Sequence, residues 1–554
     1  MTKKKALKET GGVDVKSPRR PVAVQKLATP WLWLAVLAVV TFVVFIPALQ
    51  NGFVNLDDDR YVEKNPKLFL ESKAASFKIP EGYHMGNYHP FTMVGYKIIY
   101  GAAQLDPYVY HLVNVILHVL NTLLAFFFIQ RLTKQNTIAF AAALLFGVHA
   151  IHVESVAWIS ELKDLLYAFF FFAALIFYVR YIDERNKSFY AFALVLFVCS
   201  LFSKAMAASL AVVLPLIDFY RGRKFTMAVI LEKVPFFVLA LIFGVIAIRA
   251  QQSMEAIQDS TLYAPVERIA FASYGFVTYL WKLVLPINLS AYYAYPVKNG
   301  GSIPTYYYLY PLAVIGILVA TIMSLKKTKV VFFGVGFFAI TVFLVLQLLP
   351  VGGAIMADRY AYIPSLGIFF LFAVGLQRLY ENQSQRALAY GALGVLTVLY
   401  GVLTWERCKV WKDGMTLWSD VIDKAQTIVL AYNNRGVLYN EEGSAILARA
   451  KTDPTAQQRA NAQFNLALND FDNALRLNNK DAQAWSNRGL SFWRMNRLDS
   501  AANNMQRAIN IDPNYEVAWS NLGSIYASMG RNDDALTAFK KAVELNPGFA
   551  DGWY

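Results

Sequence analysis

The chain has 554 residues, of which 56% are hydrophobic and only 16% are charged. Soluble domains carry about 45–50% apolar and about 25% charged residues, so this composition excludes an ordinary soluble protein and predicts that lipid covers much of the chain. The net charge of +14 does not indicate a nucleic-acid partner, because most Lys and Arg residues lie in the N-terminal tail and in short loops, where such residues orient membrane spans. Two cysteines give neither a disulfide framework nor a zinc spacing.

Residues 1–30 form a basic tail, and the apolar run that follows lacks a small-residue cleavage pattern. We therefore expect an uncleaved anchor with its N-terminus in the cytoplasm. About eleven transmembrane helices are predicted over residues 31–405, because each apolar run is about as long as a bilayer crossing and the even-numbered turns are short and basic. The runs cover residues 31–49, 109–130, 137–155, 165–182, 188–203, 206–220, 234–250, 307–325, 330–349, 363–379 and 387–405.

The runs leave outer loops at residues 50–108, 149–164, 251–306 and 350–362. One further apolar stretch, 270–286, is interpreted as a re-entrant or interfacial helix, because Lys282 and several aromatic residues suit a membrane interface. If it crossed instead, the C-terminal part would face the cytoplasm. The odd number of crossings places that part outside.

Residues 406–554 repeat with a period of 34 residues, which is the period of tetratricopeptide (TPR) repeats. The spacing relates Trp485 to Trp519 and Trp553, Gly489 to Gly523, and Pro513 to Pro547. The glycines are expected to let paired helices approach closely and the tryptophans to be buried between neighbouring pairs. Repeats are predicted near 429–482, 483–516 and 517–550; in the first, an insertion extends the helices or forms a loop. Since Trp553 opens a further copy that stops at Tyr554, either the chain is truncated, which we favour, or another element caps the array.

Asp57, Asp58 and Asp59 follow the first span in the sequence NGFVNLDDDRY. Three adjacent carboxylates repel one another, which raises the pKa of at least one of them unless a cation or a donor neutralises the charge. One interpretation is a solvated turn after a helix end. The other is a general base or metal ligand at the bilayer edge.

A second polar cluster follows the third span in the sequence GVHAIHVESVAWISELKDLL. His152 and Glu154 are candidate ligands of a divalent ion, and Lys163 and Asp164 follow on the same loop. Histidines at span ends are often only interfacial. The triple aspartate on the same surface makes the ligand hypothesis the stronger of the two.

Lys204 and Arg359 each lie beside a span at the outer end. Either could reach lipid headgroups without further function, or both could bind a phosphate, for which Arg offers a fork and Lys a point charge. His89, in HMGNYHPFT, is expected to line the same cleft. No phosphate-binding glycine loop, nucleophile elbow or zincin pair occurs in the chain.

The order of these segments resembles the transmembrane and tetratricopeptide-containing (TMTC) O-mannosyltransferases and their bacterial relatives in the GT-C glycosyltransferase superfamily. The resemblance covers nearly the whole chain, through NGFVNLDDD, YHPFT, HLVNVILHVLN, VHAIHVESVAWISELKDLL, LFSKAMA, LPINLSAYYAYP, ADRYAYIPSLG and the repeats. It implies an all-α fold, in which a GT-C helix bundle precedes a TPR solenoid.

The resemblance implies transfer of a sugar from a polyprenyl-phosphate donor to an acceptor, protein Ser or Thr, outside the membrane. The family's acidic pair matches Asp57 and Asp58, of which we favour Asp58 as the base. The cations that would hold the phosphate are Lys204, Arg359 and Lys163, although Lys163 stands where many relatives have Arg.

Differences at His89 and in SKAMA point to a bacterial inner-membrane member, with the array in the periplasm. A divalent cation (Mg²⁺ or Mn²⁺) stays open, because GT-C enzymes include metal-dependent and metal-independent members. A non-catalytic scaffold that recruits protein partners through the array is the rival hypothesis. A scaffold would not need an acidic pair, a His and Glu loop and two cations in one place.

Overall fold

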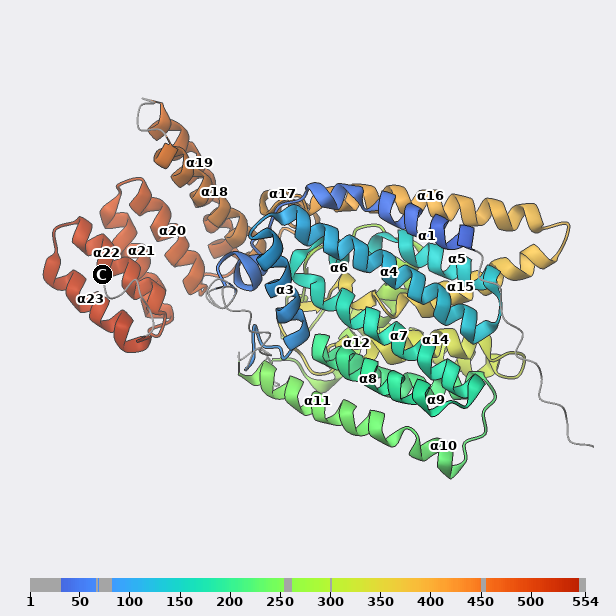
Figure 1. Cartoon of the computed structure of the whole chain (residues 1–554). Helices are drawn as coiled ribbons and strands as arrows, with labels where there is room; N and C mark the ends of the chain where they lie inside the picture. Colours follow the sequence, from blue (N-terminus) through green and yellow to red (C-terminus); the bar gives the residue numbers. More distant parts are fainter. Residues whose placement is uncertain are drawn as a thin grey trace, which may run out of the picture.

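The computed structural model describes residues 31–65, 68, 82–253, 262–298, 301–449 and 455–547. The expectations for the basic tail (1–30) and for the repeat that opens at Trp553 lie outside these residues. The described residues are mostly helical, and they divide at about residue 410 into a helix bundle and a stack of helical hairpins (Figure 1).

The bundle contains both long and short helices. They are α1 (Trp31–Val44), α3 (Pro90–Ala103), α4 (Pro107–Thr133), α5 (Asn136–Val148), α6 (Val153–Ala157), α7 (Leu162–Glu184), α8 (Lys187–Ser203), α9 (Leu210–Tyr220), α10 (Met227–Leu231), α11 (Val234–Gln252), α12 (Pro265–Val284), α13 (Tyr310–Ser324), α14 (Val330–Val342), α15 (Ser365–Glu381) and α16 (Arg386–Val410). Short turns of 3₁₀ or π type join them: η1 (Ile46–Gln50), η2 (Asp59–Glu63), η3 (Ala150–His152), η4 (Ile159–Glu161), η5 (Ala205–Ser209), η6 (Thr305–Leu309), η7 (Phe343–Val345) and η8 (Asp358–Ala361). Strands β1 (Tyr293–Ala294) and β2 (Ala354–Met356) pair antiparallel.

Five helices of the described residues are long and apolar enough to cross a membrane, or six if the bent pair around His149 counts as one span. Four shorter apolar helices accompany them. The predicted count of eleven crossings is therefore not confirmed. The stretch that we expected to be re-entrant or interfacial forms α12, which is not among these candidate spans.

The third predicted span, 137–155, is not continuous. Helix α5 ends at Val148, and the chain bends by 53° before it continues through Ala150–Ala157. The predicted outer loop 149–164 is buried along its whole length, because its short turns pack between α4, α7 and η8. A segment expected to face water thus forms part of the core.

Helices α1 and α16 run side by side in the same direction (Figure 1). At their C-terminal ends the Asn51 amide donates a hydrogen bond to the carbonyl of Cys408 over 3.1 Å. The hairpin stack begins directly after α16, so it lies at the end of the bundle where α1 ends and away from the end where α1 begins.

The stack consists of α17 (Gly414–Lys424), α18 (Val429–Arg449), α19 (Ala456–Leu477), α20 (Ala482–Arg494), α21 (Leu498–Ile511), α22 (Glu516–Ser528) and α23 (Asn532–Leu545). The insertion in the first repeat lengthens both of its helices, and only residues 450–454 of it lie outside the described chain. Pro513 and Pro547 follow the ends of α21 and α23, where proline cannot continue a helix.

Glycines mark the closest helix contacts of the array. A Cβ atom at Gly523 would lie 2.8 Å from the ring of Phe539, and one at Gly489 would lie 3.1 Å from Met505. The tryptophans differ from our expectation, because Trp485 and Trp519 are only half-buried. Their indole N–H groups donate to the carbonyls of Asn479 and Pro513, which keeps one edge of each ring at the surface.

Replacing Gly523 by Ala should destabilise the array by about 1–2 kcal/mol, because the overpacking outweighs the better helix propensity of Ala. Gly394→Ala in α16 is the control, since nothing lies within 4 Å of a Cβ atom there. Thermal unfolding followed by tryptophan fluorescence measures both. Equal melting of the two variants would show that Phe539 does not fill the gap between α22 and α23.

Candidate active site

The loop after α1 holds Asp58 in a closed environment. Asp58 is 1% exposed, and its carboxylate accepts hydrogen bonds from the backbone N–H of Val54 and from the N–H and hydroxyl of Ser160. Burial raises the pKa of Asp58 to about 7, although these hydrogen bonds oppose the shift. The neighbouring charge of Asp57 is the smallest of these influences, so the expected mutual repulsion is not the main cause.

Asp57 lies in a different environment from its neighbour. Its side chain is partly exposed, and its backbone carbonyl accepts from the N–H groups of Arg60 and Tyr61. Burial raises the pKa of Asp57, while the charges of Lys163 and Arg359 lower it. Asp57 is therefore the carboxylate of the pair that faces the cations. Asp59 begins η2, and no contact between its carboxylate and these cations occurs among the described residues.

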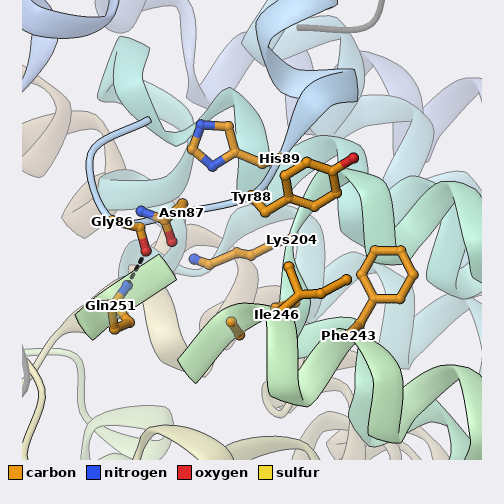
Figure 2. Close-up of a pocket in the computed structure, with 10 residues that line it drawn as sticks. Gly86, Asn87, Tyr88, His89, Lys204, Phe243, Ile246 and Gln251 are labelled. Atoms are coloured by element: carbon orange, nitrogen blue, oxygen red, sulfur yellow. Dashed lines mark hydrogen bonds between the residues drawn. The ribbon is translucent and has the colours of Figure 1, made fainter. Parts of the chain in front are cut away.

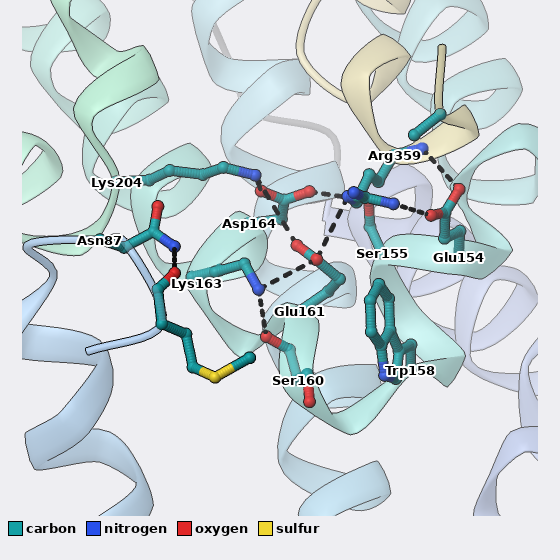
Figure 3. Close-up of polar contacts among 12 residues, drawn as sticks. Asn87, Glu154, Ser155, Trp158, Ser160, Glu161, Lys163, Asp164, Lys204 and Arg359 are labelled. Atoms are coloured by element: carbon teal, nitrogen blue, oxygen red, sulfur yellow. Dashed lines mark hydrogen bonds and ion pairs between the residues drawn. The ribbon is translucent and has the colours of Figure 1, made fainter. Parts of the chain in front are cut away.

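Glu161 is the centre of an ion network at the same end of the bundle (Figure 3). Its carboxylate, 1% exposed, lies 3.1 Å from Lys163 Nζ, 3.3 Å from Arg359 Nε and 3.7 Å from Lys204 Nζ. Two of the cations have a second carboxylate: Lys204 pairs with Asp164, and Arg359 pairs with Glu154. Three acidic and three basic side chains from α6, η4, α7, η8 and the turn before η5 thus meet in one cluster.

Aromatic rings make cation–π contacts with two of the cations, Arg359 and Lys163. The guanidinium of Arg359 lies 5.4 Å from the ring of Trp158, and Lys163 Nζ lies 5.6 Å from the same ring and 4.8 Å from that of Tyr61. Such contacts favour a cation without neutralising it. The cations keep their charge close to Asp57.

A narrow cleft opens beside Lys204 (Figure 2). One wall is the turn Gly86–His89, and the other is the apolar face of α11 with Phe243 and Ile246. The amide of Gln251, at the end of α11, donates to the carbonyl of Gly86 over 2.7 Å and joins the two walls. Since α11 belongs to a candidate span, the cleft connects a lipid-facing helix with the ion network.

His89 lines this cleft at the start of α3. Burial and then the charge of Lys163 hold its pKa well below the usual range, so the ring is neutral at neutral pH. Its Nε2 atom is buried and has no hydrogen-bond partner among the residues that the structure describes. The ring is positioned to meet a ligand in the cleft.

His152 does not join Glu154 in a ligand pair. Both of its ring nitrogens already have partners, the carbonyl of Phe146 at 2.8 Å and the hydroxyl of Ser365 at 3.0 Å. Glu154 instead binds the side chain and the backbone N–H of Arg359. No group of three or more metal-ligating side chains occurs among the described residues, so the geometry gives our divalent-cation hypothesis no ligand set.

The structure brings Asp57, Lys163, Asp164, Lys204, Arg359 and Glu154 to one place and leaves His152 and Asp59 aside. Our sequence reasoning missed Glu161, Trp158 and Ser160, although all three lie within the WISELKD sequence that drew attention. Their signal was weak, because a one-turn 3₁₀ helix has no periodicity that would predict where each side chain points.

Both the repeats and the bundle have counterparts in known proteins. Two tetratricopeptide repeat models match residues 458–516 and 517–549. The chain is 23% identical over 461 residues to protein O-mannosyl-transferase TMTC3 of Homo sapiens, covering 75% of this chain and 47% of that protein. It is also 23% identical to Tmtc3 of Drosophila melanogaster, over 75% of this chain and 51% of that protein. The chain is homologous to the TMTC proteins.

The chain spans about half the length of these two TMTC relatives. Among solved structures, a thermophilic TPR protein of Thermus thermophilus matches with 21% identity and a TM-score of 0.23, over 34% of this chain and 86% of that one. So low a score adds nothing about the fold.

Glu161→Gln should destabilise the protein by about 3–5 kcal/mol, because it leaves buried cations without their shared partner. Glu544→Gln, in the exposed pair with Lys541, is the control and should cost less than about 0.5 kcal/mol. Melting of both purified variants in detergent measures the difference. A Glu161→Gln protein as stable as the control would show that the network does not hold the fold.

The raised pKa of Asp58 predicts a dependence of stability on pH. Because the folded protein binds this proton more tightly than the unfolded chain, the stabilisation is complete below the ordinary value of 3.8 and is lost as pH rises through about 7. The melting temperature of the wild type should therefore fall, relative to that of Asp58→Asn, between roughly pH 4 and 7. If the melting temperatures of the two proteins change with pH in the same way over this range, the pKa of Asp58 is not raised.

Proposed function

We propose that the chain is a membrane glycosyltransferase that transfers a sugar from a polyprenyl-phosphate donor to a hydroxyl group of a protein. The observation that carries the proposal is the convergence of Asp57, Lys163, Lys204 and Arg359 beside a cleft with one polar and one apolar wall. The names of the homologous TMTC proteins, which describe O-mannosyl transfer, support the same class of reaction.

The cleft suits a ligand with an apolar chain and an anionic head. Phe243 and Ile246 on α11 offer contacts to the chain, and Lys204 offers a cation to a phosphate at the polar end. A lysine already paired with Asp164 and Glu161 can turn toward a phosphate without a change in its charge. Arg359 and Lys163 lie behind it and stabilise the negative charge that develops on the leaving phosphate.

We assign the general base to Asp57 rather than to Asp58, which the sequence favoured. A base must reach the proton of the acceptor, and both oxygens of Asp58 are already occupied by hydrogen-bond donors inside the protein. Asp57 removes the proton of the acceptor hydroxyl while that oxygen attacks the anomeric carbon. The bond from this carbon to the phosphate oxygen breaks, and the lipid phosphate leaves with the electron pair.

The proposal includes the finer architecture expected from the sequence: a GT-C bundle over 31–405 with eleven crossings, and a TPR domain over 406–554. Since α1 and α16 run in the same direction, an odd number of crossings is consistent with their geometry. With the N-terminus in the cytoplasm, the site and the array then lie together on the outer side, the periplasm of a bacterial cell. The array would bind the protein acceptor.

The scaffold hypothesis is the weaker account of this site. A scaffold gains nothing from four charged groups gathered in one place, one of which, Lys204, lines a cleft, and burying such groups costs stability unless they are paired. A transfer assay decides between the two. Purified protein in nanodiscs would be given radiolabelled hexose on polyprenyl phosphate and an acceptor peptide rich in Ser and Thr. Glycosylated peptide is the expected product, and its absence with every hexose tried would overturn the proposal.

Asp57→Asn should lower the transfer rate by about a hundredfold or more, because the amide keeps the shape of the side chain and cannot accept the proton. Its melting temperature should stay close to that of the wild type, since the carboxylate has no hydrogen-bond partner that the change removes among those described. Asp58→Asn is the matched control. Full activity of Asp57→Asn, or an equal loss in a stable Asp58→Asn protein, would overturn the assignment.

A further inference from the structure

The loop that carries Asp57 is hydrogen-bonded to the first two helices of the repeat array, α17 and α18. The indole N–H of Trp418, on α17, donates to the amide oxygen of Asn55 over 2.8 Å. The amide nitrogen of Asn55 donates in turn to the carbonyl of Asn434, on α18, over 3.1 Å. Because an indole nitrogen is only a donor, these two bonds fix which way the amide of Asn55 points.

Neighbouring contacts tighten the same attachment. The N–H of Gly52 donates to the carbonyl of Lys412 over 2.8 Å. A Cβ atom at Gly414 would collide with the amide oxygen of Asn55, so glycine is what allows α17 to approach the loop this closely. With Asp58 bound to Ser160, the backbone is held on both sides of Asp57.

A second contact reaches the cation side of the site. Trp411, fully buried after α16, stacks on Trp158 with ring centroids 5.6 Å apart and planes 27° apart. Trp158 is the ring that lies under Arg359 and Lys163. The short segment between the last bundle helix and the array thus touches both halves of the site.

We propose that Trp418, acting through Asn55, is a positioning residue for Asp57. The first helices of the array, α17 and α18, are then a structural part of the active site. The inference rests on the proposed function. It predicts that loss of one indole N–H at the array alters the rate of transfer, although Trp418 touches neither substrate nor the reacting atoms. A carboxylate that is displaced by a fraction of an ångström is a poorer base, while donor binding at Lys204 and Arg359 is unaffected.

The experiment compares Trp418→Phe with Trp519→Phe. Both variants keep an aromatic ring and lose one indole hydrogen bond, but that of Trp519 goes to Pro513 within the array. Trp418→Phe should lower kcat by about five- to tenfold, the loss expected for one hydrogen bond, with KM for the donor unchanged. Trp519→Phe should leave both constants unchanged. Asn55→Ala should lower kcat to a similar extent, and the double variant should be no worse than either single one.

A second measurement does not depend on activity. Amide hydrogen exchange of the peptide covering residues 51–60 should be faster in Trp418→Phe than in the wild type and unchanged in Trp519→Phe. Equal effects of the two variants, or additive losses in the double variant, would overturn the inference. A wild type without transfer activity would overturn the proposed function alone, and the exchange measurement would still decide whether Trp418 holds the loop.

Discussion

The buried carboxylate of Glu161 is the interaction on which the rest of this site depends. Removing three cations from water at the end of an apolar bundle is costly unless each meets a counter-charge at close range. Glu161 lies within 3.7 Å of all three, which no other carboxylate among the described residues does. Glu154 and Asp164 then balance the remaining positive charge, and the loops that carry these groups can pack without water.

The need to pair these buried cations explains why the chain is not a simple series of straight spans. The segment after α5 bends by 53° and passes through three short helices, η3, α6 and η4, which brings Glu154 and Glu161 to Arg359. A straight span would have carried these carboxylates away from the cations. The same segment gives Asp58 its hydrogen bonds from Ser160 and so joins the loop after α1 to the segment after α5.

Much of the architecture could be predicted from the sequence, because it rests on periodicity. The 34-residue repeat predicted the array, and most of the apolar runs lie on helices of the bundle, although the run 137–155 breaks after Val148. The sequence also indicated the charges at one end of the bundle, since such residues are rare beside membrane spans. Our preference for Asp58 over Asp57 had no structural basis in the sequence: neighbours in an irregular loop have no fixed orientation, and only the packing of Ser160 shows which carboxylate is occupied.

Other features depend on partners that are distant in the sequence. His152 had the spacing of a metal ligand, yet its partner Ser365 is 213 residues away and only the fold reveals the bond. Trp485 and Trp519 were expected to be enclosed, but a polar indole edge is satisfied more easily at the surface, by a carbonyl of the preceding turn.

The hydrogen bond between Asn55 and Trp418 joins the bundle to the repeat array. Asn55 and Trp418 are 363 residues apart, so the bond between them closes a loop of chain that contains almost the whole bundle. A repeat array joined to the bundle only by a linker would make no such contact with the loop after α1. Here the loop is closed between Ser160 on one side and the array on the other, and the side chain of Asp57 lies between these two attachments. The geometry of the candidate base is therefore a property of bundle and array together, and neither part alone contains it.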